Sequence, residues 1–569
     1  MFVWHKQGRN VFSKNLIVYL VSMSNFSITE RPATIHKLIT EEYDLLIIGG
    51  GITGAGIALD AASRGLKTAL IEKNDFAFGT SSRSTKLIHG GLRYLKQLEF
   101  GLVKEVGSER AIVHKLAPHL VIPEKMLLPL SEKKGMGYWL TSIGLKIYDW
   151  LAGVRPADQR KMLTKQQTLR YEPLLRKDDI KGGAIYAEYR TDDARLTIEI
   201  IKAACAQGAD ILSYCKVTDF LYFDGQIGGV RTTDELLQHT YEVRSKVVVN
   251  AAGPWVDELR DINRSKEGKR LHLTKGVHIV VSHTKLPVKQ AIYFNVDDGR
   301  MIFAIPRGRI TYIGTTDTFY DGDKDQVFTT RKDAEYLVAA VNANFPSVSL
   351  TVSDIESSWA GLRPLIYEEG KSASELSRKD EIFESPSGLI SIAGGKLTGY
   401  RKMAERVVNL VVRKHFDQRP LSDCKTQQLK LTANPLKNIK EVKTFTTSLA
   451  QKLKNFNFKS HMPQYLVENY GQQVVLILDL WSDRNVDEDP ELSLLKAELF
   501  FCIQYEMVCT LQDFFVRRTG LINFDIQKVI RWKTEIAQAC KTQLHWKDEK
   551  VKEELDAINL LLASITRFA

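Results

Sequence analysis

The segment from Tyr43 to Lys73 constrains the fold of this chain more than any other part of the sequence. It begins with a continuous apolar run, as expected of a parallel strand that is buried on both faces. Three glycines follow in GxGxxG spacing, a helical stretch comes next, and a second apolar strand ends in Glu72. The three glycines are Gly49, Gly51 and Gly54.

This spacing is typical of a dinucleotide-binding βαβ unit. Glycines at these positions let the backbone approach a pyrophosphate at the N-terminus of the helix. Glu72 lies about 20 positions after the motif, where an acidic side chain can accept hydrogen bonds from a ribose hydroxyl. The sequence therefore predicts a Rossmann-like domain that binds a dinucleotide through the three glycines and Glu72.

Two later segments return to the same kind of strand and turn. VVVNAAGPWVDEL (247–259) is an apolar strand that enters a Gly-Pro turn, and it carries Ala252 and Gly253. SIAGGKLTGYRKMAERVV (391–408) repeats the strand, glycine pair and helix around Gly395. A chain that returns to one ligand from its beginning, middle and end suits the long FAD molecule better than NAD.

The stretch GTSSRSTKLIHGGLRYL (79–95) follows the first unit and is unusual for a globular chain. It gathers hydroxyl groups, cations, a histidine and a glycine pair, with few apolar residues among them. A solvated loop would explain this composition in isolation equally well. Its interpretation therefore depends on the motifs around it.

Together these motifs resemble the FAD-dependent glycerol-3-phosphate dehydrogenases. The segments that carry the resemblance are YDLLIIGGGITGAGIALDAASRGL, GTSSRSTKLIHGGLRYL, YRTDDARL, NAAGPWVDEL, KGVHIVV, IGTTDT, AGLRPL and GGKLTGYRKMAE. They follow the family's order across residues 43–408, and residues 497–521 resemble the family's C-terminal domain. The resemblance implies noncovalently bound FAD and oxidation of sn-glycerol 3-phosphate to dihydroxyacetone phosphate by hydride transfer to the flavin.

The resemblance also assigns residues around the cofactor. The stretch after the second strand would lie along the FAD diphosphate and flavin ring, where a glycine pair allows an approach that a Cβ atom would block. A helix that begins within GGKLT would direct its amides and positive dipole end toward the N1/O2 edge of the flavin. The cofactor-binding residues implied in this way are Thr80, Ser81, Ser82, Lys86, Gly90, Gly91, Ala252, Gly253, Gly395, Lys396, Leu397 and Thr398.

Several cations in these motifs suit a phosphorylated substrate. A phosphate dianion favours several cations around it, and arginine can bind two of its oxygens at once. For Arg378 a surface ion pair stays an open alternative, whereas Arg363 lies between Gly361 and Pro364, an unusual place for a solvated charge. The substrate-binding residues implied by the resemblance are Arg93, Tyr94, Arg363, Arg378 and Lys396.

Two histidines compete for the role of general base. His89 precedes the glycine pair beside the expected flavin, and His278 lies in KGVHIVV, an expected strand of the substrate domain. Histidine suits proton transfer near neutral pH, but a structural histidine is at least as common. We rank His89 first as the flavin neighbour and keep His278 as the alternative. Arg363 is the third catalytic candidate.

The order of the motifs predicts an α/β fold with a C-terminal helical domain. Residues 1–40 form an N-terminal extension, for which an organelle presequence and a non-native start before Met23 are equal alternatives. An FAD-dependent oxidoreductase region follows at 41–420, and the helical domain covers 421–569. The Rossmann-like FAD-binding domain is expected to be discontinuous, with segments 41–110, 190–260 and 385–420. The β-rich substrate domain is expected to take 111–189 and 261–384.

Other features argue against further kinds of site. The six cysteines show no CxxC pair and no metal-ligand spacing, so we expect reduced thiols and no metal. DGDKD (321–325) imitates a calcium loop but lacks the later glycine and glutamate. The net charge of +11 indicates an anionic partner, and the scatter of the cations along the chain argues against nucleic acid. Arg517 and Arg518 are expected to be partners between domains and not ligands.

The electron acceptor is open between a membrane quinone, which we expect, and oxygen, as in related oxidases. A nonenzymatic FAD-bearing binding module is a third alternative, which bleaching of the flavin by glycerol 3-phosphate would exclude. No apolar run reaches the length that spans a bilayer. Because a quinone keeps its tail in lipid, we expect peripheral, cytoplasmic-side association with the inner membrane and its anionic surface. A homodimer stays an open alternative.

The segment GMGYWLTSIGLKIYDWLAG (135–153) generates a test of membrane binding. Its apolar residues recur at helical spacing with aromatic borders, which suits a helix lying in the membrane interface or a helix packed on the substrate domain. We expect the double change Ile143→Glu and Ile147→Glu to abolish co-sedimentation with anionic vesicles, while activity with a soluble acceptor persists. Loss of both properties would identify a packed helix.

Overall fold

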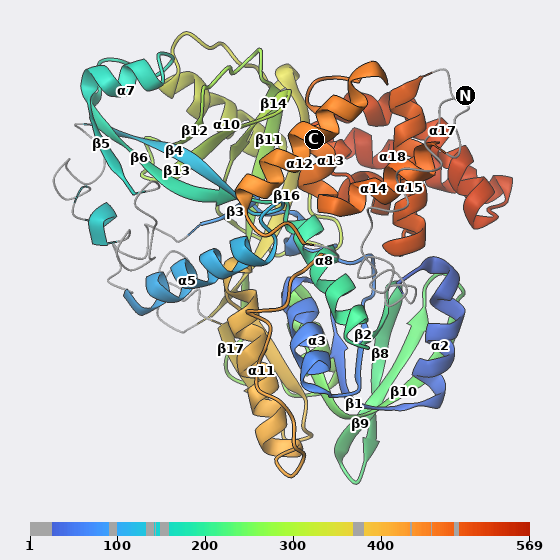
Figure 1. Cartoon of the computed structure of the whole chain (residues 1–569). Coiled ribbons are helices and arrows are strands. Elements are labelled where there is room, and N and C mark those ends of the chain that lie inside the picture. The colour runs from blue at the N-terminus through green and yellow to red at the C-terminus, as the bar shows by residue number, and fades with distance from the viewer. Residues whose placement is uncertain are drawn as a thin grey trace.

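We describe the protein from a computed structural model. The described residues are 26–89, 100–131, 142, 144–147, 159–367, 380–432, 435–456, 458–482 and 489–568. They form two β-sheets with helices packed on them, and a block of helices at the C-terminal end (Figure 1). The α/β fold class and the helical C-terminal part predicted from the sequence are confirmed.

The first sheet is mainly parallel and carries the glycine-rich motif. Its central strand β1 (Glu42–Ile48) lies between β2 (Thr68–Ile71) and β10 (His239–Asn250) and runs parallel to both. The strand order is β17, β18, β10, β1, β2, β7, and the hairpin of β8 and β9 joins through β10. The remaining bounds are β7 (Asp210–Leu212), β8 (Cys215–Phe223), β9 (Gln226–Asp234), β17 (Asp380–Glu384) and β18 (Ile390–Gly394).

Both faces of this sheet are covered, which explains the continuous apolar run of β1. Leu45 and Ile47 belong to a core that includes side chains of α3, α8 and α11. Leu46 and Ile48 point the other way, into a second core that includes Leu38 of α2. The bounds of these helices are α2 (Arg31–Thr40), α3 (Ile52–Arg64), α8 (Asp193–Ala206) and α11 (Tyr400–His415).

Helix α2 falls within the range that the sequence prediction set apart as an N-terminal extension. Its Arg31 side chain is buried, forms an ion pair with Asp234 at 2.7 Å and donates to the Ser213 carbonyl at 2.6 Å. A buried ion pair to β9 ties the helix to the first sheet. The folded part of the chain therefore begins before residue 41.

The second sheet is mainly antiparallel and carries α10 (Arg331–Asn344) on one face. Its long strand β11 (Leu271–Ser282) pairs with β14, β15 and β16, and apolar residues of β11 and α10 share one core. The sheet also takes in β3, from a range that the sequence prediction gave to the FAD-binding domain. The other bounds are β3 (Leu87–Ile88), β4 (Ile122–Ser131), β5 (Lys161–Thr164), β6 (Ile180–Arg190), β12 (Ala291–Asn295), β13 (Met301–Arg307), β14 (Ile310–Gly314), β15 (Thr318–Phe319) and β16 (Ile355–Ile366).

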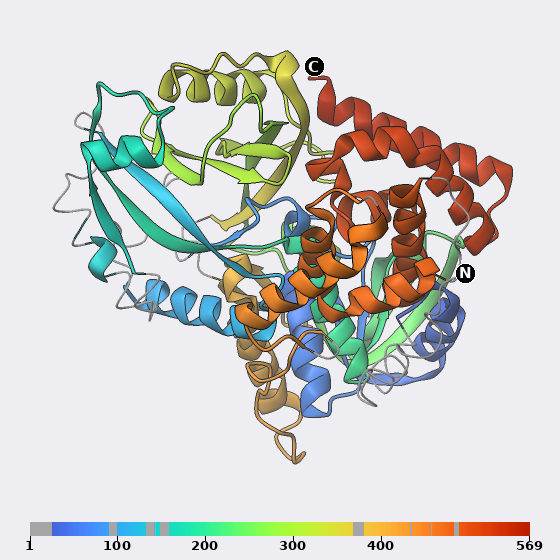
Figure 2. The same cartoon turned by 45° about the horizontal axis from the view of Figure 1, so that its top comes forward.

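The C-terminal helices form one block with its own core, drawn orange to red beside both sheets in Figures 1 and 2. Helix α18 reaches the second sheet, where Ser358 of β16 donates to the Ile565 carbonyl at 3.0 Å. A π-helical turn, η9 (Asp513–Arg518), contacts α8, one of the helices packed on the first sheet. The bounds are α12 (Ile439–Leu453), α13 (Met462–Tyr470), α14 (Val474–Ser482), α15 (Pro490–Tyr505), α16 (Leu521–Phe524), α17 (Ile526–Leu544) and α18 (Asp548–Thr566).

The turn between β1 and α3 depends on its glycines for different reasons. Gly49 has a φ of +113°, which favours glycine. A Cβ atom on Gly54 would lie 1.9 Å from the Gly49 carbonyl oxygen, so only glycine allows the helix to pack this closely on the strand. A Cβ atom on Gly51 would meet a single described atom within 4 Å, the Ser81 Oγ at 3.2 Å. Apart from that hydroxyl, which would have to shift slightly, Gly51 faces the cavity and not packed protein.

This contrast predicts different outcomes for two matched substitutions. Gly54→Ala is expected to destabilise the protein by at least about 3 kcal/mol, because a backbone oxygen cannot move aside cheaply. Gly51→Ala is expected to cost about 1 kcal/mol or less, because its backbone angles suit any residue. Thermal unfolding and flavin absorbance would test both: Gly51→Ala should melt nearly as the native chain does but retain less cofactor. Equal stability of the two variants would contradict the packing argument.

Candidate active site

Three glycine-rich turns meet at the carboxyl edge of the first sheet and line one cavity. Because β18, β10 and β1 are parallel neighbours, the turns that follow them come together at one end. The turn after β1 brings Gly49 and Gly51, and β2 leads into Glu72 beside them. The other two turns contribute Ala251, Ala252, Gly253, Gly394, Gly395, Lys396 and Leu397.

Glu72 lies at the edge of this cavity and is held by backbone amides. Its carboxylate accepts hydrogen bonds from the Gly50 amide at 2.6 Å and the Asn74 amide at 2.9 Å. Burial raises the pKa of the Glu72 carboxyl above its usual range, against the effect of these two donors. The acid therefore connects the end of β2 to the glycine-rich turn in a fixed orientation.

The three hydroxyl residues after β2 occupy different positions. Ser81 lines the cavity, and its Oγ accepts the Ile52 amide of the first turn of α3 at 2.9 Å. Thr80 also lines the cavity and donates to the Leu362 carbonyl at 2.7 Å, which ties the turn to β16. Ser82 is buried and is not among the described residues that line the cavity.

Lys86 is buried at the base of this segment and not in the described cavity wall. Its ammonium group donates to the Asp193 carboxylate at 2.6 Å and to the Ser82 carbonyl at 3.1 Å, and Asp192 lies 3.7 Å away. A lysine with these partners ties the segment to the N-terminus of α8. The structure thus places Lys86 beneath the segment that carries Thr80 and Ser81, where it is bonded to protein groups and does not line the described cavity.

The turn before α11 has the form that the sequence predicted for GGKLT. Gly394 and Gly395 both have positive φ angles, and a 3₁₀ turn over Leu397–Gly399 leads into α11. Lys396 lies at the N-cap of this turn and lines the cavity, whereas Thr398 is buried. The N-terminal end of α11 is therefore directed toward the cavity wall.

The two candidate histidines lie in different surroundings. His278 is enclosed: its ring stacks on Trp359 at 4.9 Å, and Nε2 shares a hydrogen bond with the Thr85 hydroxyl at 3.0 Å. Its buried Nδ1 finds no hydrogen-bond partner among the described residues. Burial, helped by Arg363 and Lys86, holds the pKa of His278 well below its usual range, so its ring is neutral at neutral pH. His89 is half-buried, with Phe303 edge-on at 6.2 Å.

Arg363 lies on β16, and the residues on either side of it in the chain both reach the cavity region. Its guanidinium donates to the Asp317 carboxylate at 3.0 Å and to the Thr315 hydroxyl at 3.1 Å, and the side chain is 26% exposed. The residue before it accepts the hydrogen bond from Thr80, and the residue after it, Pro364, lines the cavity. Arg363 is therefore partly accessible and held in one orientation.

Some predicted residues lie outside the described part of the chain. These are Gly90, Gly91, Arg93, Tyr94 and Arg378, together with most of the segment 135–153. Within that segment Leu145 is described, and it is buried in a core with residues of the second sheet.

The sequence prediction missed other residues of the cavity wall. Trp255 lines it at the Gly-Pro turn, with the Lys73 ammonium 4.4 Å from its ring, and Phe78 lies 6.3 Å from the same ring. Asp325, from the apparent calcium loop, also lines the cavity and forms an ion pair with Lys73 at 2.8 Å. The sequence carried no signal for this pair, because its members are far apart in the chain, in loops that follow β2 and β15.

Comparison with known proteins agrees with this arrangement. Residues 44–401 match a family model described as FAD dependent oxidoreductase, and residues 424–551 match the C-terminal domain of alpha-glycerophosphate oxidase. The aerobic glycerol-3-phosphate dehydrogenase of Staphylococcus aureus is 49% identical over 521 residues, which are 91% of this chain and 93% of that protein.

Two solved structures extend the comparison. The glycerol-3-phosphate dehydrogenase of Bacillus halodurans, complexed with FAD, has a TM-score of 0.81 at 44% identity, over 95% of this chain and 98% of that one. The L-alpha-glycerophosphate oxidase of Mycoplasma pneumoniae, with FAD bound, shares the fold with a TM-score of 0.55 at 20% identity, over 69% and 98% of the two chains. The cavity at three glycine-rich turns and a match across nearly the whole length show that this chain belongs to the FAD-dependent glycerol-3-phosphate dehydrogenase family.

Proposed function

We propose that the protein oxidises sn-glycerol 3-phosphate to dihydroxyacetone phosphate and passes the electrons to a membrane quinone. The observation that carries the proposal is the cavity at the three glycine-rich turns, in a chain 49% identical to an aerobic glycerol-3-phosphate dehydrogenase. FAD, when bound, supplies the hydride acceptor. The residues of this chain bind and orient both partners of the reaction.

The cavity wall offers what a dinucleotide needs. Gly51 leaves room for a phosphate group beside the N-terminus of α3, where the backbone amides and the helix dipole favour an anion. Glu72 is positioned to accept hydrogen bonds from ribose hydroxyls. The amides at the start of α11, after Lys396, favour negative charge at the far end of the cavity. These residues bind the cofactor in our proposal.

Arg363 is the substrate-binding residue with the strongest support in the described part of the chain. Its planar group is oriented by Asp317 and Thr315 and remains partly exposed, so it can present a donor edge to a phosphate. In our proposal Arg363 binds the substrate phosphate, and Lys396, in the turn before α11, shares the negative charge. A substrate without phosphate would offer these cations no dianion to bind.

We assign the general base to His89. A base must reach the proton of the substrate hydroxyl, and His89 is half-buried while His278 is enclosed. The lowered pKa of His278 also makes its ring a poor proton acceptor. His278 instead supports the segment 79–89 through its hydrogen bond to Thr85.

The choice of a quinone over oxygen rests on similarity. The relative at 49% identity is a dehydrogenase, whereas the oxidase structure shares only the fold at 20% identity. None of the helices in the described residues is long and apolar enough to cross a bilayer. In our proposal the protein meets the quinone by peripheral contact with the anionic membrane surface.

An anaerobic stopped-flow experiment tests the proposed reaction. Glycerol 3-phosphate is expected to bleach the flavin absorbance within the turnover time, and glycerol is not, because it lacks the group that the cations bind. Mixing the bleached protein with a soluble quinone should restore the absorbance much faster than mixing it with oxygen. Faster recovery with oxygen would identify an oxidase, and absence of bleaching would contradict the dehydrogenase activity itself.

Arg363→Lys tests the substrate site. Lysine keeps the charge but loses the planar fork, so we expect kcat/KM for glycerol 3-phosphate to fall about 10- to 100-fold. FAD content should be unchanged and the melting temperature should stay within about 2 °C. Arg309→Lys is the matched control, since Arg309 is 32% exposed and paired with Glu356 on the same sheet. Loss of flavin or unfolding in Arg363→Lys would show that the residue is structural.

A further inference from the structure

The loop after β2, residues 72–79, separates the cofactor cavity from the C-terminal helices. On one side of this 72–79 loop, Glu72, Lys73, Phe78 and Gly79 line the cavity. On the other side, the side chain of Asp75 is fully buried. Asp75 is therefore a carboxyl group enclosed by protein, three residues from the acid expected to bind ribose.

Asp75 is held by two consecutive arginines of the C-terminal domain. Arg518 donates to both of its carboxylate oxygens, at 2.8 and 2.9 Å, and the Nε of Arg517 donates to one of them. The arginines hold the pKa of the Asp75 carboxyl below its usual range, so the group is charged. The expectation that Arg517 and Arg518 are partners between domains is confirmed.

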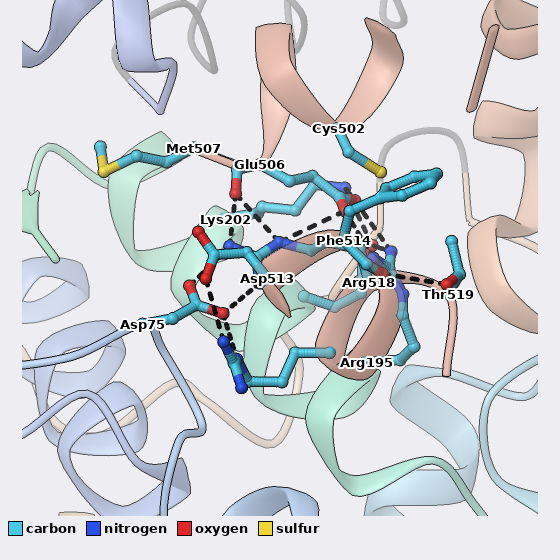
Figure 3. A network of polar contacts seen from close by, with 12 residues as sticks. Asp75, Arg195, Lys202, Cys502, Glu506, Met507, Asp513, Phe514, Arg518 and Thr519 are labelled. Atoms are coloured by element: carbon cyan, nitrogen blue, oxygen red, sulfur yellow. Dashed lines mark hydrogen bonds and ion pairs between the residues drawn. The ribbon is translucent and has the colours of Figure 1, made fainter. Parts of the chain in front are cut away.

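The arginines are themselves fixed by a larger buried network, drawn in Figure 3. Arg517 donates to Asp513 at 2.9 Å, and Arg518 donates to the Glu506 carbonyl at 2.7 Å. The Glu506 carboxylate in turn binds cations of α8. The charged residues of the network are Asp75, Glu199, Glu506, Asp513, Arg195, Lys202, Arg517 and Arg518.

This network balances four carboxylates against four cations in a region with almost no exposed surface. Removing one member of a buried ion pair leaves an uncompensated charge, which is strongly unfavourable. The network therefore allows one arrangement of the 72–79 loop relative to the C-terminal domain.

The loop transmits this position to the cavity by two routes. The Ala77 amide donates to the Gly50 carbonyl at 3.0 Å, and the Gly50 amide donates to Glu72 at 2.6 Å, so loop and glycine-rich turn are bonded in both directions. In addition, the Arg517 guanidinium lies 5.7 Å from the ring of Phe78, a residue of the cavity wall. A shift of Asp75 would therefore move both Glu72 and Phe78.

We propose that the C-terminal helical domain contributes to FAD binding. Arg517 and Arg518 are positioning residues: through their bonds to Asp75 they hold the 72–79 loop in place, and the position of this loop determines the affinity for FAD. The inference rests on the proposed contact between Glu72 and the cofactor. It gives the C-terminal domain a role in cofactor binding in addition to covering the two sheets.

The test measures FAD binding to full-length apoprotein by flavin fluorescence, beside thermal unfolding of the same apoprotein. Asp75→Asn keeps the shape but loses the charge, and Arg517→Lys keeps the charge but loses the fork and the contact to Phe78. We expect each to raise the dissociation constant for FAD at least tenfold. If Asp75→Asn does not fold, Arg517→Lys decides the question.

Glu199→Gln is the matched control, because Glu199 belongs to the same buried network but forms its hydrogen bonds with Arg195 and Lys202 of α8 and Gln473 of the C-terminal domain, and not with the loop. We expect it to lower the melting temperature of the apoprotein while the FAD dissociation constant stays within twofold of native. Weaker FAD binding in Glu199→Gln, in proportion to its loss of stability, would overturn the proposal. Native affinity in Asp75→Asn or Arg517→Lys would overturn it as well.

Glu72→Gln separates this inference from the proposed cofactor contacts. If that variant binds FAD as the native protein does, the proposed contact between Glu72 and the cofactor is wrong. The Asp75 and Arg517 variants then test only whether the loop affects FAD binding through Phe78. If the native apoprotein does not bind FAD, the proposed function fails, whatever the loop variants do.

Discussion

The close contact between α3 and β1 is the constraint on which the rest of the structure depends. Gly54 packs so near the Gly49 carbonyl that no side chain fits between them, and this brings the helix N-terminus to the carboxyl edge of the sheet. The parallel strands β10 and β18 deliver their own glycine-rich turns to the same edge. The cavity, and with it the proposed chemistry, follows from this one approach of helix to strand.

Around that edge the protein uses buried charge to keep separate parts of the chain together. Lys86 is paired with Asp193 at the start of α8, and Asp75 is paired with arginines of the C-terminal domain. Lys73 and Asp325 form a further, more exposed pair between the loops that follow β2 and β15. Because the hydrogen bonds in these charged pairs are directional, they fix how these parts lie relative to one another, while the apolar cores supply the burial.

The candidate residues of the active site differ in how far their side chains are exposed to solvent. Arg363 and His89 remain partly exposed, which agrees with the substrate-binding and base roles that we propose for them. His278 and Lys86 are enclosed, and both form hydrogen bonds within the segment 79–89. The sequence prediction assigned Lys86 to the cofactor, Arg363 to the substrate, and the two histidines to one catalytic role as alternatives. Their separation into exposed and supporting positions is a result of packing.

The sequence alone determined the parallel strands, the glycine-rich turns and the position of Glu72, because each depends on residues close together in the chain. It also determined the family, through the order of several such motifs along residues 43–408. Regular apolar runs and glycine spacing reflect local backbone requirements, so they can be read without coordinates. The tertiary structure alone decided that α2 is tied to the first sheet, that Asp325 pairs with Lys73, and that Arg517 and Arg518 bind Asp75. These contacts join residues hundreds of positions apart, and the strength of a buried charge pair depends on burial and geometry that no local pattern encodes.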